Sequence, residues 1–76
     1  MIEIDRSELL SKGRNCFDRG DLKRASIIYN ELLEGADPVN DRDTLVECYF
    51  QMGNIFHHQG EIGKAIKAFN KVIELE

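Results

Sequence analysis

Several residue types are scarce in this sequence. It contains no tryptophan, one proline and two cysteines. Two cysteines are too few for the disulfide framework on which small secreted domains depend. Residues 1–5 also lack the basic stretch and apolar core of a secretory signal peptide. We therefore expect a cytoplasmic protein whose thiols are free.

Long apolar runs and clusters of basic residues are missing as well. No stretch approaches the roughly 20 apolar residues that a membrane-spanning helix requires. The 10 basic residues are outnumbered by 14 acidic ones, which gives a net charge of −4, and Lys23-Arg24 is their longest run. Nucleic-acid binders need clustered lysines and arginines to displace the counterions of phosphates. We therefore expect neither a membrane nor a nucleic acid as partner.

Motifs of catalysis and of metal binding are also absent. No glycine-rich phosphate loop follows a strand-like segment, and no Ser/His/Asp combination is indicated. His57 and His58 are adjacent, and neighbouring residues of a helix point about 100° apart, so the pair is poorly placed to share one ion. The sequence therefore predicts no enzyme, no cofactor and no metal site.

The main positive feature is an internal repeat with a constant separation of 40 residues. Small and polar residues recur at this separation: Gly13 with Gly53, Gly20 with Gly60, Ala25 with Ala65, Asn30 with Asn70 and Glu34 with Glu74. Apolar positions match too, as Tyr29 does with Phe69. Small and large residues would not stay aligned together by chance. We interpret residues 1–76 as one domain of two repeats, at about 5–38 and about 41–76.

Each repeat has the pattern of two helices joined by a glycine turn. Apolar and small residues recur every three or four positions, as on one face of a helix. Gly20 and Gly60 end the first helix of each repeat, since glycine readily adopts the left-handed conformation found there. Asp21 is predicted to cap the helix that follows. We expect an all-α fold with helices at about 5–19, 21–34, 61–75 and a third helix that starts within 38–43 and ends near 59.

Three finer expectations concern packing and helix starts. Gly13 and Gly53 lie in mid-helix, where glycine costs about 1 kcal/mol relative to alanine. We therefore predict that the backbone of a second helix comes close to each glycine, with Ala25 and Ala65 as the partners. Ala68 is expected to lie one turn off this contact. Asp37 followed by Pro38 resembles a cap and a first helical residue, which predicts an early start for the third helix. Cys16 and Cys48 are expected about 12 Å apart along parallel helices, too far for a disulfide.

These residues resemble the tetratricopeptide repeat family, whose pattern of large, small and aromatic residues runs over two helices. The second repeat follows that pattern in Tyr49, Met52, Gly53, Phe56, Ala65 and Phe69, and the first repeat in Leu9, Lys12, Gly13, Cys16, Ala25 and Tyr29. The period of 40 residues exceeds the family's 34. We attribute the difference to a longer turn together with the early start of the third helix.

The resemblance implies a short right-handed α-solenoid whose first helices line a concave groove. Family members bind a peptide or helix of a partner protein there. The groove positions of this sequence are Leu10, Arg14, Phe17, Phe50, Asn54 and His57. The apolar residues among them are predicted to anchor the ligand, and Arg14 and Asn54 to orient it. Two other interpretations stay open: the phenylalanines pack against a neighbouring helix, and the polar residues are ordinary solvated side chains.

A structural role in self-assembly is the alternative function. Repeat stacks usually need about three units and a polar cap to be stable. Two repeats leave Ile66, Phe69, Val72 and Ile73 of the last helix only partly covered. Either two copies pair through the groove or through this helix, or the chain is part of a larger repeat scaffold.

Overall fold

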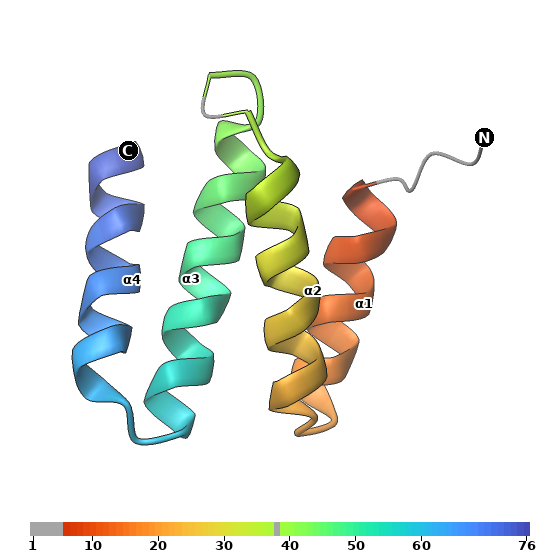
Figure 1. Ribbon diagram of the computed structural model, residues 1–76, viewed down its shortest axis with the longest axis vertical. Helices are drawn as coiled ribbons and strands as arrows, with labels where there is room; N and C mark the ends of the chain where they lie inside the picture. The colour runs from red at the N-terminus through yellow and green to blue at the C-terminus, as the bar shows by residue number, and fades with distance from the viewer. Residues whose placement is uncertain (1–5, 38) are drawn as a thin grey trace.

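Four helices make up the part of this chain that the structure describes. The computed structural model describes residues 6–37 and 39–76. The helices are α1 (Arg6–Asp18), α2 (Leu22–Gly35), α3 (Arg42–His58) and α4 (Ile62–Leu75), and the described residues contain no strand. Neighbouring helices run antiparallel, with the α1–α2 and α3–α4 turns at one end of the molecule and the α2–α3 connection at the other (Figure 1). The all-α fold predicted from the sequence is confirmed.

The two short turns have the same backbone geometry. Gly20 has φ 81° and Gly60 has φ 78°, the left-handed conformation that favours glycine. After α1, the N–H of Asp21 donates to the carbonyl of Cys16 at 2.8 Å, and the equivalent bond after α3 is also 2.8 Å long. This is the Schellman arrangement that ends many helices. Asp21 then accepts a hydrogen bond from the N–H of Arg24 at 3.2 Å, so the predicted cap is confirmed.

The connection between the repeats differs from the prediction. Helix α3 starts at Arg42 with Asp41 as its N-cap residue, so Asp37 does not cap it. The Asp37 carboxylate instead accepts hydrogen bonds from the N–H groups of Val39 (2.8 Å) and Asn40 (3.4 Å). These bonds close a separate turn ahead of the helix, so the predicted cap at Asp37 was wrong, whereas the observed start at Arg42 lies within the predicted range of 38–43. Pro38, and the Asp5 end of the first predicted helix, lie outside the described residues.

The mid-helix glycines make room for aromatic rings. A Cβ added to Gly13 would lie 2.8 Å from Cζ of Tyr29, and one added to Gly53 would lie 2.6 Å from Cε1 of Phe69. The nearest neighbours of these glycines are therefore rings of the second helix in each pair, and not the alanines that we predicted. The space is needed because a ring is too thick to fit beside a helix that carries a side chain at that position.

Helix α3 lies at the centre of the hydrophobic core. It packs against α4 within its own repeat and against α2 of the first repeat. The buried hydrophobic residues are Ala25, Tyr29, Leu32, Leu45, Cys48, Met52, Ile55, Ala65 and Ala68. Ala65 and Ala68 are both buried, with exposed fractions of 3% and 7%. Both cysteines are free, as predicted.

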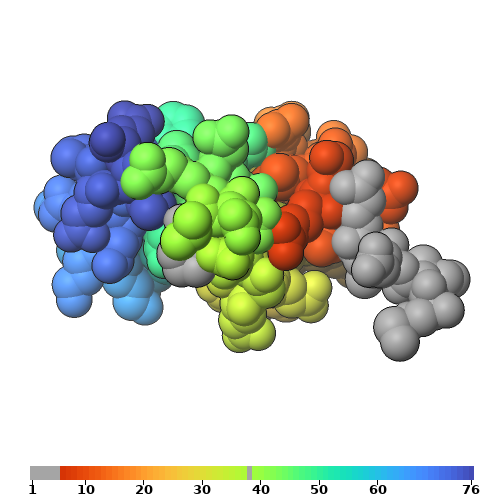
Figure 2. Space-filling model, turned by 90° about the horizontal axis from the view of Figure 1, so that it is seen from above, coloured from red at the N-terminus to blue at the C-terminus, as the bar shows by residue number. Residues whose placement is uncertain are grey.

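The molecule is flat and elongated, with extents of 39 × 29 × 15 Å. Figure 2 shows it from above, with α1 towards one end and α4 at the other. A stack of two pairs has two ends, and the two inner helices have packed neighbours on both sides: α2 lies between α1 and α3, and α3 lies between α2 and α4. The two outer helices, α1 and α4, therefore form the ends of the stack, and their outward-facing side chains make up the end surfaces.

Replacing Tyr29 by phenylalanine is expected to raise the free energy of unfolding by about 1 kcal/mol. The Tyr29 hydroxyl is buried and has no hydrogen-bond partner among the described residues, and burial raises its pKa to about 12. A buried, unpaired polar group costs about 1–3 kcal/mol, and the second repeat has Phe69 at the same position. Urea unfolding measures the change, with Tyr49→Phe at a half-buried tyrosine as control. A lower midpoint for Tyr29→Phe would show that the hydroxyl is hydrogen-bonded.

Candidate functional site

Six positions form an apolar surface at the α4 end of the stack, which we call the end face. Its residues are Phe50 on α3 and Ile62, Ile66, Phe69, Val72 and Ile73 on α4. Four of them are large and exposed: Phe50 by 47%, Ile62 by 51%, Ile66 by 55% and Ile73 by 71%. The rings of Phe50 and Phe69 contact each other with their centroids 6.0 Å apart. Contiguous exposed apolar surface of this kind marks interaction sites.

The same six positions of the first repeat are covered. They hold Leu10, Leu22, Ser26, Tyr29, Leu32 and Leu33. Tyr29 and Leu32 are buried, and the leucines at the other positions pack against a core to which α3 contributes Cys48, Met52 and Ile55. Ser26 also contacts Met52, with Oγ 3.9 Å from Sδ. In the first repeat, α3 therefore covers the surface formed by these six positions. In the second repeat, no helix among the described residues covers the equivalent end face.

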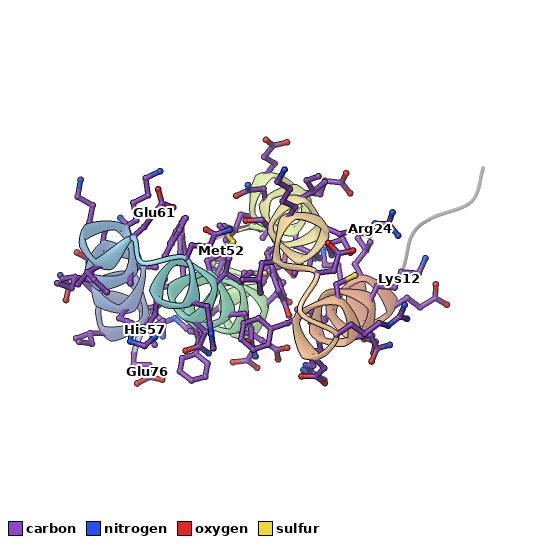
Figure 3. The ribbon with its side chains drawn as sticks, turned by 90° about the horizontal axis from the view of Figure 1, so that it is seen from below. Lys12, Arg24, Met52, His57, Glu61 and Glu76 are labelled. Atoms are coloured by element: carbon purple, nitrogen blue, oxygen red, sulfur yellow. The ribbon has the colours of Figure 1, made fainter. Side chains whose placement is uncertain are left out.

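A hollow of about 630 Å³ lies beside the end face. Its walls come from α1, α3 and α4, and its lining residues are Arg14, Asp43, Val46, Glu47, Phe50, Gln51, Val72 and Glu76. Figure 3 shows Glu76 and His57 on one side of the α3–α4 pair and Glu61 on the opposite side. The hollow combines apolar side chains with one guanidinium and three carboxylates.

Arg14 and Glu47 form a two-pronged ion pair between α1 and α3. The Arg14 Nε donates to one carboxylate oxygen of Glu47 at 2.6 Å, and Nη2 donates to the other at 2.5 Å. The hydrogen bond and the charge of Glu47 raise the pKa of Arg14 above its usual value. Paired hydrogen bonds of this geometry fix both side chains. Arg14 is thus held by the chain itself, and its charge in the hollow is largely balanced.

The structure brings only some of the predicted groove residues together. Arg14 and Phe50 both line the hollow. Leu10 and Phe17 are half-buried and pack against the core, and the edge of the Phe17 ring meets His58 at a centroid distance of 5.5 Å. Two other predicted residues stand apart from the hollow lining: half-buried Asn54 and exposed His57.

Sequence reasoning did not identify Glu47 as the partner of Arg14, or Val46 and Val72 as lining residues. Arg14 and Glu47 are 33 residues apart, and nothing local links them. The available signal was that both lie on first helices of neighbouring repeats and carry opposite charges. For Val72, the signal was the uncovered apolar stripe of the last helix.

The end face and the hollow beside it consist mainly of apolar and charged side chains. Within residues 6–37 and 39–76, no group of three His, Cys, Asp or Glu side chains is placed to hold a metal ion. None of the described helices is long and apolar enough to cross a membrane. What the surface offers is apolar area with a few charges at its border, the usual composition of a protein interface.

Comparison with known sequences gives one match. The tetratricopeptide repeat model matches residues 46–76, which comprise most of α3 and all of α4. No match was found among curated proteins or among solved structures. The matched segment contains all six residues of the end face.

Proposed function

We propose that this chain binds a helix or an extended peptide of a partner protein on the end face and in the hollow beside it, because residues 46–76 match the model of the tetratricopeptide repeat family. Repeats of this family generally mediate protein–protein interaction and are typically not catalytic. One observation supports this choice of surface: four of the six end-face residues are exposed, whereas their counterparts in the first repeat are buried or half-buried against a core that includes residues of α3.

The way α3 sits on the first repeat indicates the kind of ligand that fits. Its buried residues Cys48, Met52 and Ile55 follow one another at intervals of four and three residues. This spacing is that of the apolar face of an amphipathic helix laid into a groove. A partner helix with medium-sized apolar residues at the same spacing would cover the end face in the same way.

The charges of the hollow favour a basic group on the ligand. Asp43, Glu47 and Glu76 line the hollow, against Arg14 as its one basic lining residue. Since Arg14 is already paired with Glu47, two carboxylates remain for a ligand. We therefore expect a lysine or arginine at the border of the bound segment, where it affects the association rate and specificity more than the affinity.

A synthetic peptide with the sequence of residues 42–58 is the first probe of this proposal. It carries the apolar face that already covers the first repeat, so it should bind the end face of the intact chain. Fluorescence anisotropy of the labelled peptide measures the affinity. The matched control is the same peptide with aspartate at the positions of Met52 and Ile55. If both peptides bind equally, or if neither binds, the proposal that an α3-like helix covers the end face is contradicted.

Phe50→Ala is expected to weaken binding of this peptide by about 2 kcal/mol, the effect of removing an aromatic anchor from an interface. The free energy of unfolding should change much less, because Phe50 is half exposed in the free chain. Ile27→Ala removes a 58% exposed side chain of α2 and is the control that should change neither quantity. A large loss of stability with unchanged association would place Phe50 in the core and exclude it from the site.

Self-assembly is the second candidate, and the exposed isoleucines of α4 favour it. The outer surface of α1 holds polar residues, Glu8, Ser11, Lys12 and Asn15, where α3 has Cys48, Gln51, Met52 and Ile55. A second copy therefore cannot present α1 to the end face as a substitute for an α3-like helix. Two copies would instead pair end face to end face. Sedimentation over a range of concentrations tests this: a dimer that Ile66→Asp abolishes supports it, and a monomer throughout contradicts it.

A further inference from the structure

A second hollow, which we call the lysine groove, lies between α2 and α4 on the face opposite to Glu76 and His57. It has a volume of about 340 Å³, and its lining residues are Asn30, Leu33, Tyr49, Met52, Phe56, Lys64, Lys67, Ala68 and Lys71. In Figure 3, the labelled Met52 lies in the space between α2 and α4. The floor is apolar and comes mainly from α3, and the α4 border consists of lysines.

The three lysines form a row along α4. Lys64, Lys67 and Lys71 are spaced three and four residues apart, so they share one face of the helix over about 10 Å. Their counterparts in the first repeat are Arg24, Ile27 and Glu31, which are mixed in type and charge. The packing of a repeat therefore does not require a basic row at these positions. In a chain with a net charge of −4, this row is a local exception.

The lysines are available to an anionic ligand. Lys64 lies over the ring of Phe56, 5.7 Å from its centroid, and pairs with Glu61 at 3.2 Å. Lys71 pairs with Glu74 at 3.4 Å. Both are exposed pairs within one helix, a class that contributes little to stability and is easily exchanged. Lys67 is exposed and has no ion pair among the described residues.

We propose that the lysine groove binds an acidic segment of a partner protein, with carboxylates on the lysine row and apolar side chains on the floor. Charge complementarity selects an anionic ligand, and the apolar floor selects one that also carries hydrophobic groups. A nucleic-acid backbone lacks such groups. A flat lipid surface would rest on both borders of the groove, and α2 carries exposed Glu31 and Glu34 near its border, which repel anionic headgroups. A narrow acidic segment avoids them.

The probe is a synthetic amphipathic peptide of about 15 residues, near the shortest length at which isolated helices form. It carries leucines on one face and glutamates on the rest. We expect saturable binding to the intact chain by fluorescence anisotropy, weakening as salt screens the charges. Lys67→Glu should lower the affinity at least about fivefold, since an attraction becomes a repulsion. Lys23→Glu makes the same change at an exposed lysine of α2 outside the groove and should have little effect.

Four results would overturn the proposal. The first is an equal loss of affinity in Lys67→Glu and Lys23→Glu, which would be an effect of net charge alone. The second is binding of the peptide that Phe50→Ala abolishes, which would assign it to the end face. The third is binding to phosphatidylserine vesicles in the absence of peptide binding, which would assign the groove to lipid. The fourth is unchanged binding by Lys67→Glu. A peptide with one glutamate changed to lysine should restore the affinity that the Lys67→Glu variant loses, and this result would support the proposal.

Discussion

Ile55→Ala is expected to lower the free energy of unfolding by about 2–5 kcal/mol, the usual cost of deleting a fully buried isoleucine side chain to its Cβ. Ile55 is 0% exposed and lies on α3, the one helix that packs against both α2 and α4. A domain of this length has a total stability of about 4–11 kcal/mol. The loss of this side chain should therefore remove a large part of the free energy of unfolding. The variant should be partly unfolded at room temperature.

The matched control is Ile66→Ala, which deletes the same atoms from a side chain that is 55% exposed on α4. Its unfolding midpoint in urea should stay near that of the unmodified chain. Both variants are measured at low protein concentration, so that any pairing through the end face does not contribute to the stability of either. Similar midpoints for the two variants would show that α3 does not form the centre of the core.

Gly53→Ala is expected to destabilise the chain by up to about 2 kcal/mol, even though alanine is the better helix former. The added Cβ would lie 2.6 Å from Cε1 of Phe69, and other atoms of that ring would be 2.8 Å away. Moving a packed ring costs about 1–3 kcal/mol, and the gain in helix propensity is about 1 kcal/mol. The steric term is the larger. Gly63→Ala has no neighbour within 4 Å of the added atom, and should raise the midpoint slightly.

A double substitution separates the ring contact from other causes. In the chain with Phe69→Leu, the space beside Gly53 is larger, so adding Gly53→Ala should cost much less than it does alone. The difference between the two effects measures the coupling of the two positions. If Gly53→Ala instead raises the midpoint as Gly63→Ala does, then helix propensity dominates and the close approach is not limiting.

The helices and their ends could be predicted because their signals are local. Gly20 and Gly60 adopt the left-handed conformation, and Asp21 caps the helix after it. Each of these features depends on residues within about one helical turn. The third helix starts at Arg42, within the predicted range of 38–43, but its cap was predicted wrongly, because Asp37 closes a turn with Val39 and Asn40. An aspartate before a proline serves either role, and the sequence alone does not distinguish them.

The sequence by itself determined that this chain is a pair of similar helical hairpins, since a separation of 40 residues relates matching glycines and apolar positions. Only the tertiary structure decided what those residues contact. Gly13 receives the ring of Tyr29, and Arg14 is held by Glu47, 33 residues away. The physical reason is that periodicity fixes which side of a helix faces inward, whereas the tilt and spacing of packed helices decide which side chains meet. Those quantities depend on the volumes of all the side chains between the helices. They placed Phe50 and Val72 in the lining of one hollow, whereas Leu10 and Phe17 pack against the core.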